Sequence, residues 1–293
     1  MRTTVCRWAL AVLAGFSVAP HLAAQEADES DLRRRFRSIA WEDGPAAGAL
    51  GREAEVQVPE GCRFTGAAGT KTFMELNENP TSGDERGTIL CRGPEDSGSW
   101  FVVLTYRGSG YVKDDERGEI EADKLLATIR KGNSAGNAER RKRGWETLEI
   151  DGWQRPPYYD QRTNNLTWGL RIIGASGDTT INHSVRLLGR GGVMEVDLVA
   201  GPAMTEAAMP AFETILEGFA YVPGQRYAEW RAGDKVAEYG LTALIAGGAG
   251  AAAVKSGILG KLGKAIIAVV VAAVAGLKSL AGRIFGKKSP RTA

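Results

Sequence analysis

The chain has 293 residues, of which 43% are hydrophobic and 25% are charged, and its formal net charge is +2. This composition is that of a globular protein with one or two domains. The excess of Lys and Arg over Asp and Glu lies at the two ends of the chain, whereas the long body between them has more acidic than basic residues and is mildly acidic. An acidic body is repelled by nucleic acid phosphates and by anionic lipid headgroups, which argues against both as its main ligands.

The N-terminus has the three-part layout of a secretory signal peptide. Arg2 and Arg7 precede an apolar run over residues 9–19, and two alanines precede the polar residues that follow. The alternative is an uncleaved anchor, but the run is well short of the roughly 20 residues that a spanning helix needs. We therefore predict a signal peptide over residues 1–24.

The first part of the body is predicted to contain two short helices and a strand. Residues 29–41 place apolar side chains at i, i+4 and i+7, which is one stripe of a helix, and 70–77 form a second short helix. Residues 54–58 alternate like a half-buried strand. The arginines of the first helix are interpreted as a solvated face rather than as a binding site.

The strongest strand signal lies at residues 99–106, which are aromatic and β-branched on both faces and therefore predict a central strand. The carboxylates at 114–116 suggest a cation site. Successive side chains point apart, however, and the glycine of a calcium loop is missing. We predict no metal and no cofactor there. Residues 121–131 and 134–143 are predicted as two helices.

Three alternating segments, at residues 166–172, 181–187 and 194–200, are joined by short glycine-rich turns and predict consecutive antiparallel strands. One face of these strands is apolar and the other polar. The helix predicted at 202–218 carries an apolar stripe that can cover the apolar face. The predicted fold class is α+β, an antiparallel sheet with helices packed on one face, with an N-terminal signal peptide and a C-terminal transmembrane helix added.

Cys62 and Cys91 are the two cysteines of the body. In an oxidising compartment such a pair usually forms a disulfide, which closes a loop of about 30 residues. We predict this structural disulfide, and two free buried thiols are the alternative.

The residue types needed for catalysis are sparse in the body. His183 is its only histidine, and Ser184 follows it on a predicted strand, so the two side chains point to opposite faces. They cannot form a base and nucleophile pair. A single histidine also provides too few ligands for the common types of zinc site. We assign no catalytic residue and interpret His183 as a partly buried structural side chain.

Residues 152–160 gather Trp, Arg, Pro and Tyr in an apparent connection. Aromatic residues and Arg are enriched where partners bind, although a packed loop at the sheet edge explains the pattern equally well. The residues of a possible partner or ligand surface are Trp153, Arg155, Tyr158, Trp168, His183 and Arg186.

Residues 236–293 are predicted to be a membrane anchor. The run at 241–254 is too short to span alone, whereas the run from Ile258 to Leu277 is long enough. Basic residues follow it, and these stay cytoplasmic. We therefore predict an inner-membrane protein with its body, residues 25–235, in the periplasm and its C-terminus in the cytoplasm. The alternative is a helical hairpin with both runs in the bilayer, and small residues four apart would allow self-association.

Several short stretches also carry a family resemblance. These are VPEG from Val58, WFVVLTY from Trp100, GYVKDDE from Gly110, GW with PP and YD from Gly152, LTWGLR from Leu166, RLLGR from Arg186 and YGLTALIAGGAG from Tyr239. Their order and spacing resemble a bacterial family of predicted membrane-anchored proteins known only as a domain of unknown function. The resemblance implies an exported, C-terminally anchored protein and brings no activity, substrate or catalytic residue.

Three hypotheses for the function follow. The first is a non-enzymatic envelope protein whose body binds another envelope component or oligomerises. The second is a small-ligand-binding or enzymatic domain with a pocket lined by Trp153, Tyr158, Trp168, His183 and Arg186. The third is a membrane-active module in which the glycine- and alanine-rich tail carries the function.

Overall fold

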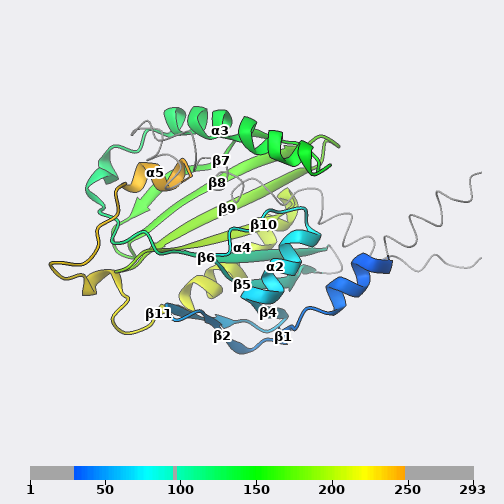
Figure 1. The fold of residues 1–293 in the computed structure, drawn as a ribbon, viewed down its shortest axis with the longest axis horizontal. Helices are drawn as coiled ribbons and strands as arrows, with labels where there is room; N and C mark the ends of the chain where they lie inside the picture. The colour runs from blue at the N-terminus through cyan, green and yellow to red at the C-terminus, as the bar shows by residue number, and fades with distance from the viewer. Residues whose placement is uncertain (1–29, 95–97, 248–293) are drawn as a thin grey trace, which may run out of the picture.

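The computed structural model describes residues 30–94 and 98–247, which form one large antiparallel sheet, one small sheet and the helices that cover them (Figure 1). Within these residues no helix has the length and apolar character to cross a membrane. The predicted signal peptide at 1–24 and the predicted span from Ile258 to Leu277 both lie outside the described residues.

The large sheet has eight strands in the order β1-β4-β5-β6-β10-β9-β8-β7, and the small sheet has the order β11-β3-β2. The strands of the large sheet are β1 (Glu42–Asp43), β4 (Cys62–Gly66), β5 (Glu85–Arg92), β6 (Ser99–Arg107), β7 (Leu148–Asp160), β8 (Asn165–Gly174), β9 (Thr179–Leu188) and β10 (Val193–Ala200). Those of the small sheet are β2 (Ala46–Leu50), β3 (Ala54–Val58) and β11 (Phe219–Tyr221). The helices are residues 30–37, α2 (Ala67–Leu76), α3 (Ala122–Lys142), α4 (Pro202–Glu217) and α5 (Leu241–Ile245), with 3₁₀ turns η2 (Asp115–Gly118) and η3 (Tyr227–Glu229).

The centre of the sheet agrees with the sequence patterns. Strand β6 pairs with β5 on one side and β10 on the other, so the prediction of a central strand is confirmed. Strands β8, β9 and β10 are consecutive and antiparallel, as predicted. Every residue of β10 is buried, and so is every residue of β9 after the first. The prediction that one face of these strands is exposed to solvent is therefore wrong.

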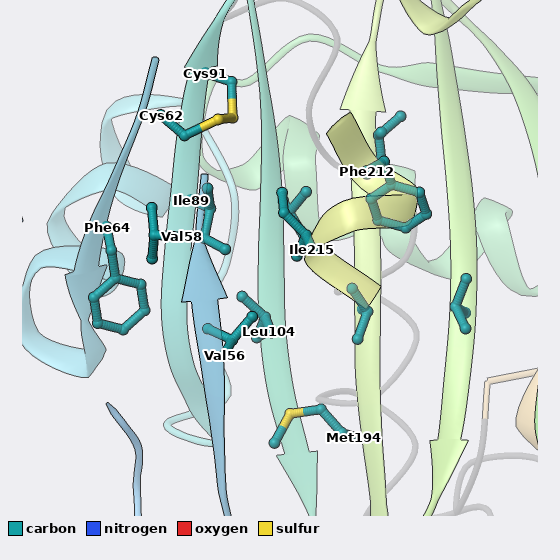
Figure 2. Close-up of a cluster of buried hydrophobic side chains, with 14 of the residues drawn as sticks. Val56, Val58, Cys62, Phe64, Ile89, Cys91, Leu104, Met194, Phe212 and Ile215 are labelled. Carbon is teal, nitrogen blue, oxygen red and sulfur yellow. A yellow bond between two sulfur atoms is a disulfide. The ribbon is translucent and has the colours of Figure 1, made fainter. Parts of the chain in front are cut away.

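One face of the large sheet, called here the α4 face, is covered by α4 and by the small sheet. Phe212 and Ile215 of α4 point onto it, and Val56 and Val58 of β3 pack beside them (Figure 2). Strand β3 was correctly predicted as half-buried, since its residues alternate between buried and exposed. It belongs to a second layer rather than to the main sheet, which local alternation cannot reveal.

The opposite face is covered by further helices, so the prediction of helices on one face only is wrong. Phe36 of the first helix and Phe73 of α2 pack on this face, where the Phe73 ring lies 4.9 Å from the ring of Phe101 in β6. Leu125 and Ile129 of α3 pack over β7 and β8 in a separate cluster. Both faces of the central strands are therefore removed from water.

Helix α3 is continuous over Ala122–Lys142, where two shorter helices were predicted. Three of its side chains bond the outer backbone edge of β7. Asn133 Nδ2 and Asn137 Nδ2 each donate to the Leu148 carbonyl at 2.7 Å, and Asn137 Oδ1 accepts from Leu148 N at 2.9 Å. Arg130 donates from Nε to the Ile150 carbonyl at 3.0 Å and from Nη2 to the next carbonyl. These polar side chains thus attach the helix to the sheet.

The body extends beyond the boundary predicted at Lys235. Val236 forms a parallel bridge with Tyr111, and Leu241, Leu244 and Ile245 are buried in the cluster beneath α3. The backbone N and the hydroxyl of Thr242 donate to one carboxylate oxygen of Glu116 at 3.1 and 2.6 Å. Helix α5 is therefore part of the body's core.

The predicted disulfide between Cys62 and Cys91 is confirmed (Figure 2). The two residues lie directly opposite each other in the β4–β5 pair, with Cα atoms 4.1 Å apart. Both are buried at the rim of the α4-face core.

Candidate functional site

The structure does not bring the six predicted surface residues together. Across neighbouring strands, directly opposed residues share a face of the sheet. Ser184 lies opposite both Trp168 and Asp197, whereas His183 lies opposite Gly169 and Leu198. His183 therefore occupies the α4 face, while Trp168 and Arg186 occupy the opposite face.

The remaining three predicted residues lie on β7, which is a strand rather than a loop connection. The Trp153 indole donates to the Ala122 carbonyl at 3.3 Å and packs beneath α3. The guanidinium carbon of Arg155 lies 4.6 Å from the ring centre of Tyr158, and 41% of Tyr158 is exposed. Arg155 and Tyr158 thus form an exposed stacked pair on the edge strand, whereas Trp153 is partly buried beneath α3.

His183 is a buried structural residue, as interpreted from the sequence. Its ring meets the ring of Phe212 edge-on, with centres 5.7 Å apart. Burial is the main reason that the pKa of His183 falls from 6.5 to about 4, with a smaller lowering from the positive charge of Arg155 and an opposing effect of Asp197. Ser184 points the other way and donates from Oγ to Asp197 at 2.6 Å.

His183 should make the stability of the body depend on pH. The unfolded chain binds the histidine proton more tightly than the folded chain does, so stability is fully present above pH 6.5 and is lost as the pH falls toward 4. Between pH 7 and 4.5 the wild type is expected to lose about 2 to 3 kcal/mol more than His183→Gln. Urea unfolding over a pH series measures this difference. Parallel pH profiles of the two proteins would contradict it.

A network of charged side chains lies on the face opposite α4. Arg186 donates from Nη1 to Asp197 at 2.9 Å, and its Nε lies 3.8 Å from Glu195. Arg107 donates to the other oxygen of Glu195 at 3.2 Å and to Asp84 at 2.7 Å. Burial opposes the charge of Arg107, but the two carboxylates outweigh it and raise the pKa of Arg107. The network compensates its own charges within the protein.

Trp168 forms one wall of this network, because the guanidinium carbon of Arg186 lies 4.7 Å from the centre of its ring. Arg186 and Trp168 are both buried. Among the described residues, Arg186 Nε and Nη2 and Trp168 Nε1 have no hydrogen-bond acceptor. In the part of the chain that the structure describes, one cleft lies between α3 and the β8–β9 turn, and another lies beside the disulfide. Neither cleft is lined by the residues predicted to form a ligand pocket.

A second aromatic group, called here the aromatic end, was missed by the sequence analysis. It consists of Tyr111, Tyr159, Tyr227 and Trp230. The rings of Tyr111 and Tyr227 stack 4.4 Å apart at 15°, and the ring of Trp230 lies 5.4 Å from that of Tyr111. Tyr159 packs against the same buried cluster as Tyr227. Burial raises the pKa of Tyr159, and nearby Asp114 and Tyr111 also raise it. The four residues come from three distant segments, so local spacing carries no signal for them.

The segment that carries Trp230 is held in place by polar contacts. Arg190 donates from Nε and Nη2 to the two carboxylate oxygens of Asp234, each at 2.7 Å. This hydrogen-bonded pair lowers the pKa of Asp234 to about 2. Glu229 accepts from the backbone N of Gly224 at 2.7 Å and of Arg226 at 2.9 Å. The position of Trp230 is thus fixed relative to the sheet.

The carboxylates at 114–116 are directed to different partners. Asp114 lies 3.6 Å from Arg117, whereas Glu116 accepts from Thr242 in α5. The Glu116 carboxylate consequently fastens α5 to the loop that precedes α3.

These features define an α+β protein in which a large antiparallel sheet is covered on both faces and presents aromatic groups at its edge and one end. The chain belongs to the family described as Protein of unknown function (DUF2167), whose model matches residues 42–278. The resemblance to an uncharacterised family is thereby confirmed. No curated protein matches the chain.

Among solved structures, the chain is similar to the solution structure of cyanobacterial PsbP (CyanoP) from Synechocystis sp. PCC 6803. The two are 12% identical, and the TM-score is 0.35. The similarity covers 63% of this chain and 92% of the other.

Proposed function

We propose that this chain is a membrane-tethered envelope protein whose body binds another envelope protein as a scaffolding component. In this proposal the signal over residues 1–24 directs export, the span from Ile258 to Leu277 holds the protein in the inner membrane, and the body lies in the periplasm. The basic residues after the span keep the C-terminus in the cytoplasm. Reporter fusions after Gly247 and after Ala293 test this topology, and periplasmic activity at both positions would overturn it.

The observation that carries the binding role is the exposed pair of Arg155 and Tyr158 on β7. Tyr and Arg are the residue types that most often dominate binding energy at protein interfaces. A tyrosine held by an arginine across its face is also partly ordered before binding, which reduces the entropy lost on association. The exposed pair therefore suits a contact with a partner protein.

The backbone around this pair favours recognition through side chains. Pro156 and Pro157 lie between Arg155 and Tyr158, and proline has no N–H to donate to an added strand. The register of β7 with β8 also shifts around Arg155. A partner is thus expected to contact the Tyr158 ring and the Arg155 guanidinium rather than extend the sheet.

Tyr158→Ala and Arg155→Ala are each expected to weaken partner binding by about 2 kcal/mol, or roughly 30-fold in Kd. The test is crosslinking of the full-length protein in intact cells, followed by identification of the captured protein and an affinity measurement. Arg162→Ala is the matched control, because the Arg162 side chain is 88% exposed and lies just beyond the end of β7. Capture of the same partner with unchanged affinity by Tyr158→Ala and Arg155→Ala would remove this surface from the proposal.

A further inference from the structure

We infer that the segment around Trp230 and Val236 rests on the headgroup layer of a phospholipid bilayer, so that the body lies against the membrane in one orientation. This inference depends on the membrane tether proposed above. It concerns a different surface from the Arg155 and Tyr158 pair, and the occupant is lipid rather than protein.

The first argument is exposure. Within residues 30–94 and 98–247, the large hydrophobic side chains that remain exposed are Tyr158 at 41%, Trp230 at 40% and Val236 at 38%. Two of these three flank Tyr111, since Trp230 contacts its ring and Val236 pairs with its backbone. Tryptophan is enriched at membrane interfaces because its ring has an apolar body and a polar N–H.

The second argument is the direction of the charges. Arg226, Arg231 and Lys235 are exposed around Trp230 and Val236. The neighbouring acids are only partly exposed and are held by hydrogen bonds, Asp234 by Arg190 and Glu229 by backbone amides. Glu238 is the exposed acid of this segment. The body as a whole is acidic, but this segment turns its cations outward, where they can meet lipid phosphates.

The third argument is the course of the chain. Residues 237–240 join Val236 to α5, and residues 248–257 lie between Gly247, where the described part ends, and the predicted span from Ile258. A short connection between a surface and a membrane span gives that surface a high effective concentration at the bilayer. A patch too small to bind vesicles alone can therefore stay docked in the tethered protein.

The fourth argument is rigidity. The stacked rings of Tyr111 and Tyr227 and the bidentate pair of Arg190 with Asp234 hold the segment against the sheet. Little conformational freedom remains to be lost when Trp230 enters the headgroup layer.

The test uses full-length protein reconstituted in vesicles of phosphatidylethanolamine and phosphatidylglycerol, with and without bromine on the acyl chains. Bromine quenches tryptophan that lies in the bilayer. In the wild type, part of the fluorescence is expected to be quenched, and Trp230→Phe is expected to remove most of this component. Trp145→Phe is the matched control, because Trp145 stacks with Arg143 just past the end of α3 and should leave the quenching unchanged.

A cysteine labelled with a polarity-sensitive dye provides an independent reading that leaves Trp230 intact. The dye at Val236→Cys should shift to shorter wavelength on vesicles, whereas the dye at Lys142→Cys, an exposed position at the end of α3, should not. Equal quenching of the wild type and Trp230→Phe, together with no dye shift at position 236, would overturn the inference. A protein that floats with the vesicles but gives this result keeps its tether, whereas a protein that fails to float contradicts the tether itself.

Discussion

Replacing Asp197 by Asn is expected to lower the free energy of unfolding by about 3 kcal/mol, because it leaves a buried arginine without its closest carboxylate. Asp197 accepts hydrogen bonds from Arg186 and Ser184, and the Arg186 side chain is only 1% exposed. The remaining carboxylate, Glu195, lies 3.8 Å from Arg186 and is shared with Arg107. Urea unfolding followed by circular dichroism measures the loss.

The control for this variant is Glu121→Gln. Glu121 pairs with Lys124, but their side chains are 61% and 76% exposed, so solvent screens the pair. Its loss should change the free energy of unfolding by less than about 1 kcal/mol. If Asp197→Asn proved no more harmful than Glu121→Gln, the network would not be the buried, charge-compensated structure described here.

Loss of the disulfide is expected to have an effect of similar size. Cys62 and Cys91 are separated by 29 positions in the sequence, and a cross-link of that span restricts the unfolded chain by about 3 to 4 kcal/mol in the chain-entropy account. The double variant Cys62→Ala with Cys91→Ala should therefore unfold at a lower urea concentration than the wild type. A reducing agent should lower the wild-type midpoint toward that of the variant.

The same reducing agent should have no effect on the double variant, which lacks both thiols. This comparison separates the contribution of the bond from that of side-chain packing at the two sites. A wild-type midpoint that did not respond to complete reduction would show that the bond adds nothing to stability.

The elements best predicted from the sequence are those whose pattern is local. The apolar residues of β6, the alternation in β8 to β10 and the stripe of α4 each identify an element without knowledge of its neighbours. The pairing of Cys62 with Cys91 also followed from cysteine number alone. These local signals predicted the fold class and the central strands of the large sheet.

The parts that were missed depend on contacts between distant segments. Ser184, Arg186 and Asp197 look like a wet face in the sequence, yet they are buried because they neutralise one another under the covering elements. The stacking of Tyr111 on Tyr227 joins segments on opposite sides of the chain's middle. Local periodicity contains no information on either arrangement, so the cover on the second face and the aromatic end could not be predicted.

The attachment of α3 to β7 has a consequence for how copies of this protein behave in crowded solution. An open sheet edge is a template on which another chain can add a strand and start a fibril. Asn133, Asn137 and Arg130 occupy the outer backbone groups at the start of β7, and prolines interrupt its later part. Since α3 ends at Lys142 and β7 begins at Leu148, the covering helix is close in sequence to the edge that it covers. The edge can therefore be closed as soon as it appears, which leaves little time for aggregation to begin there.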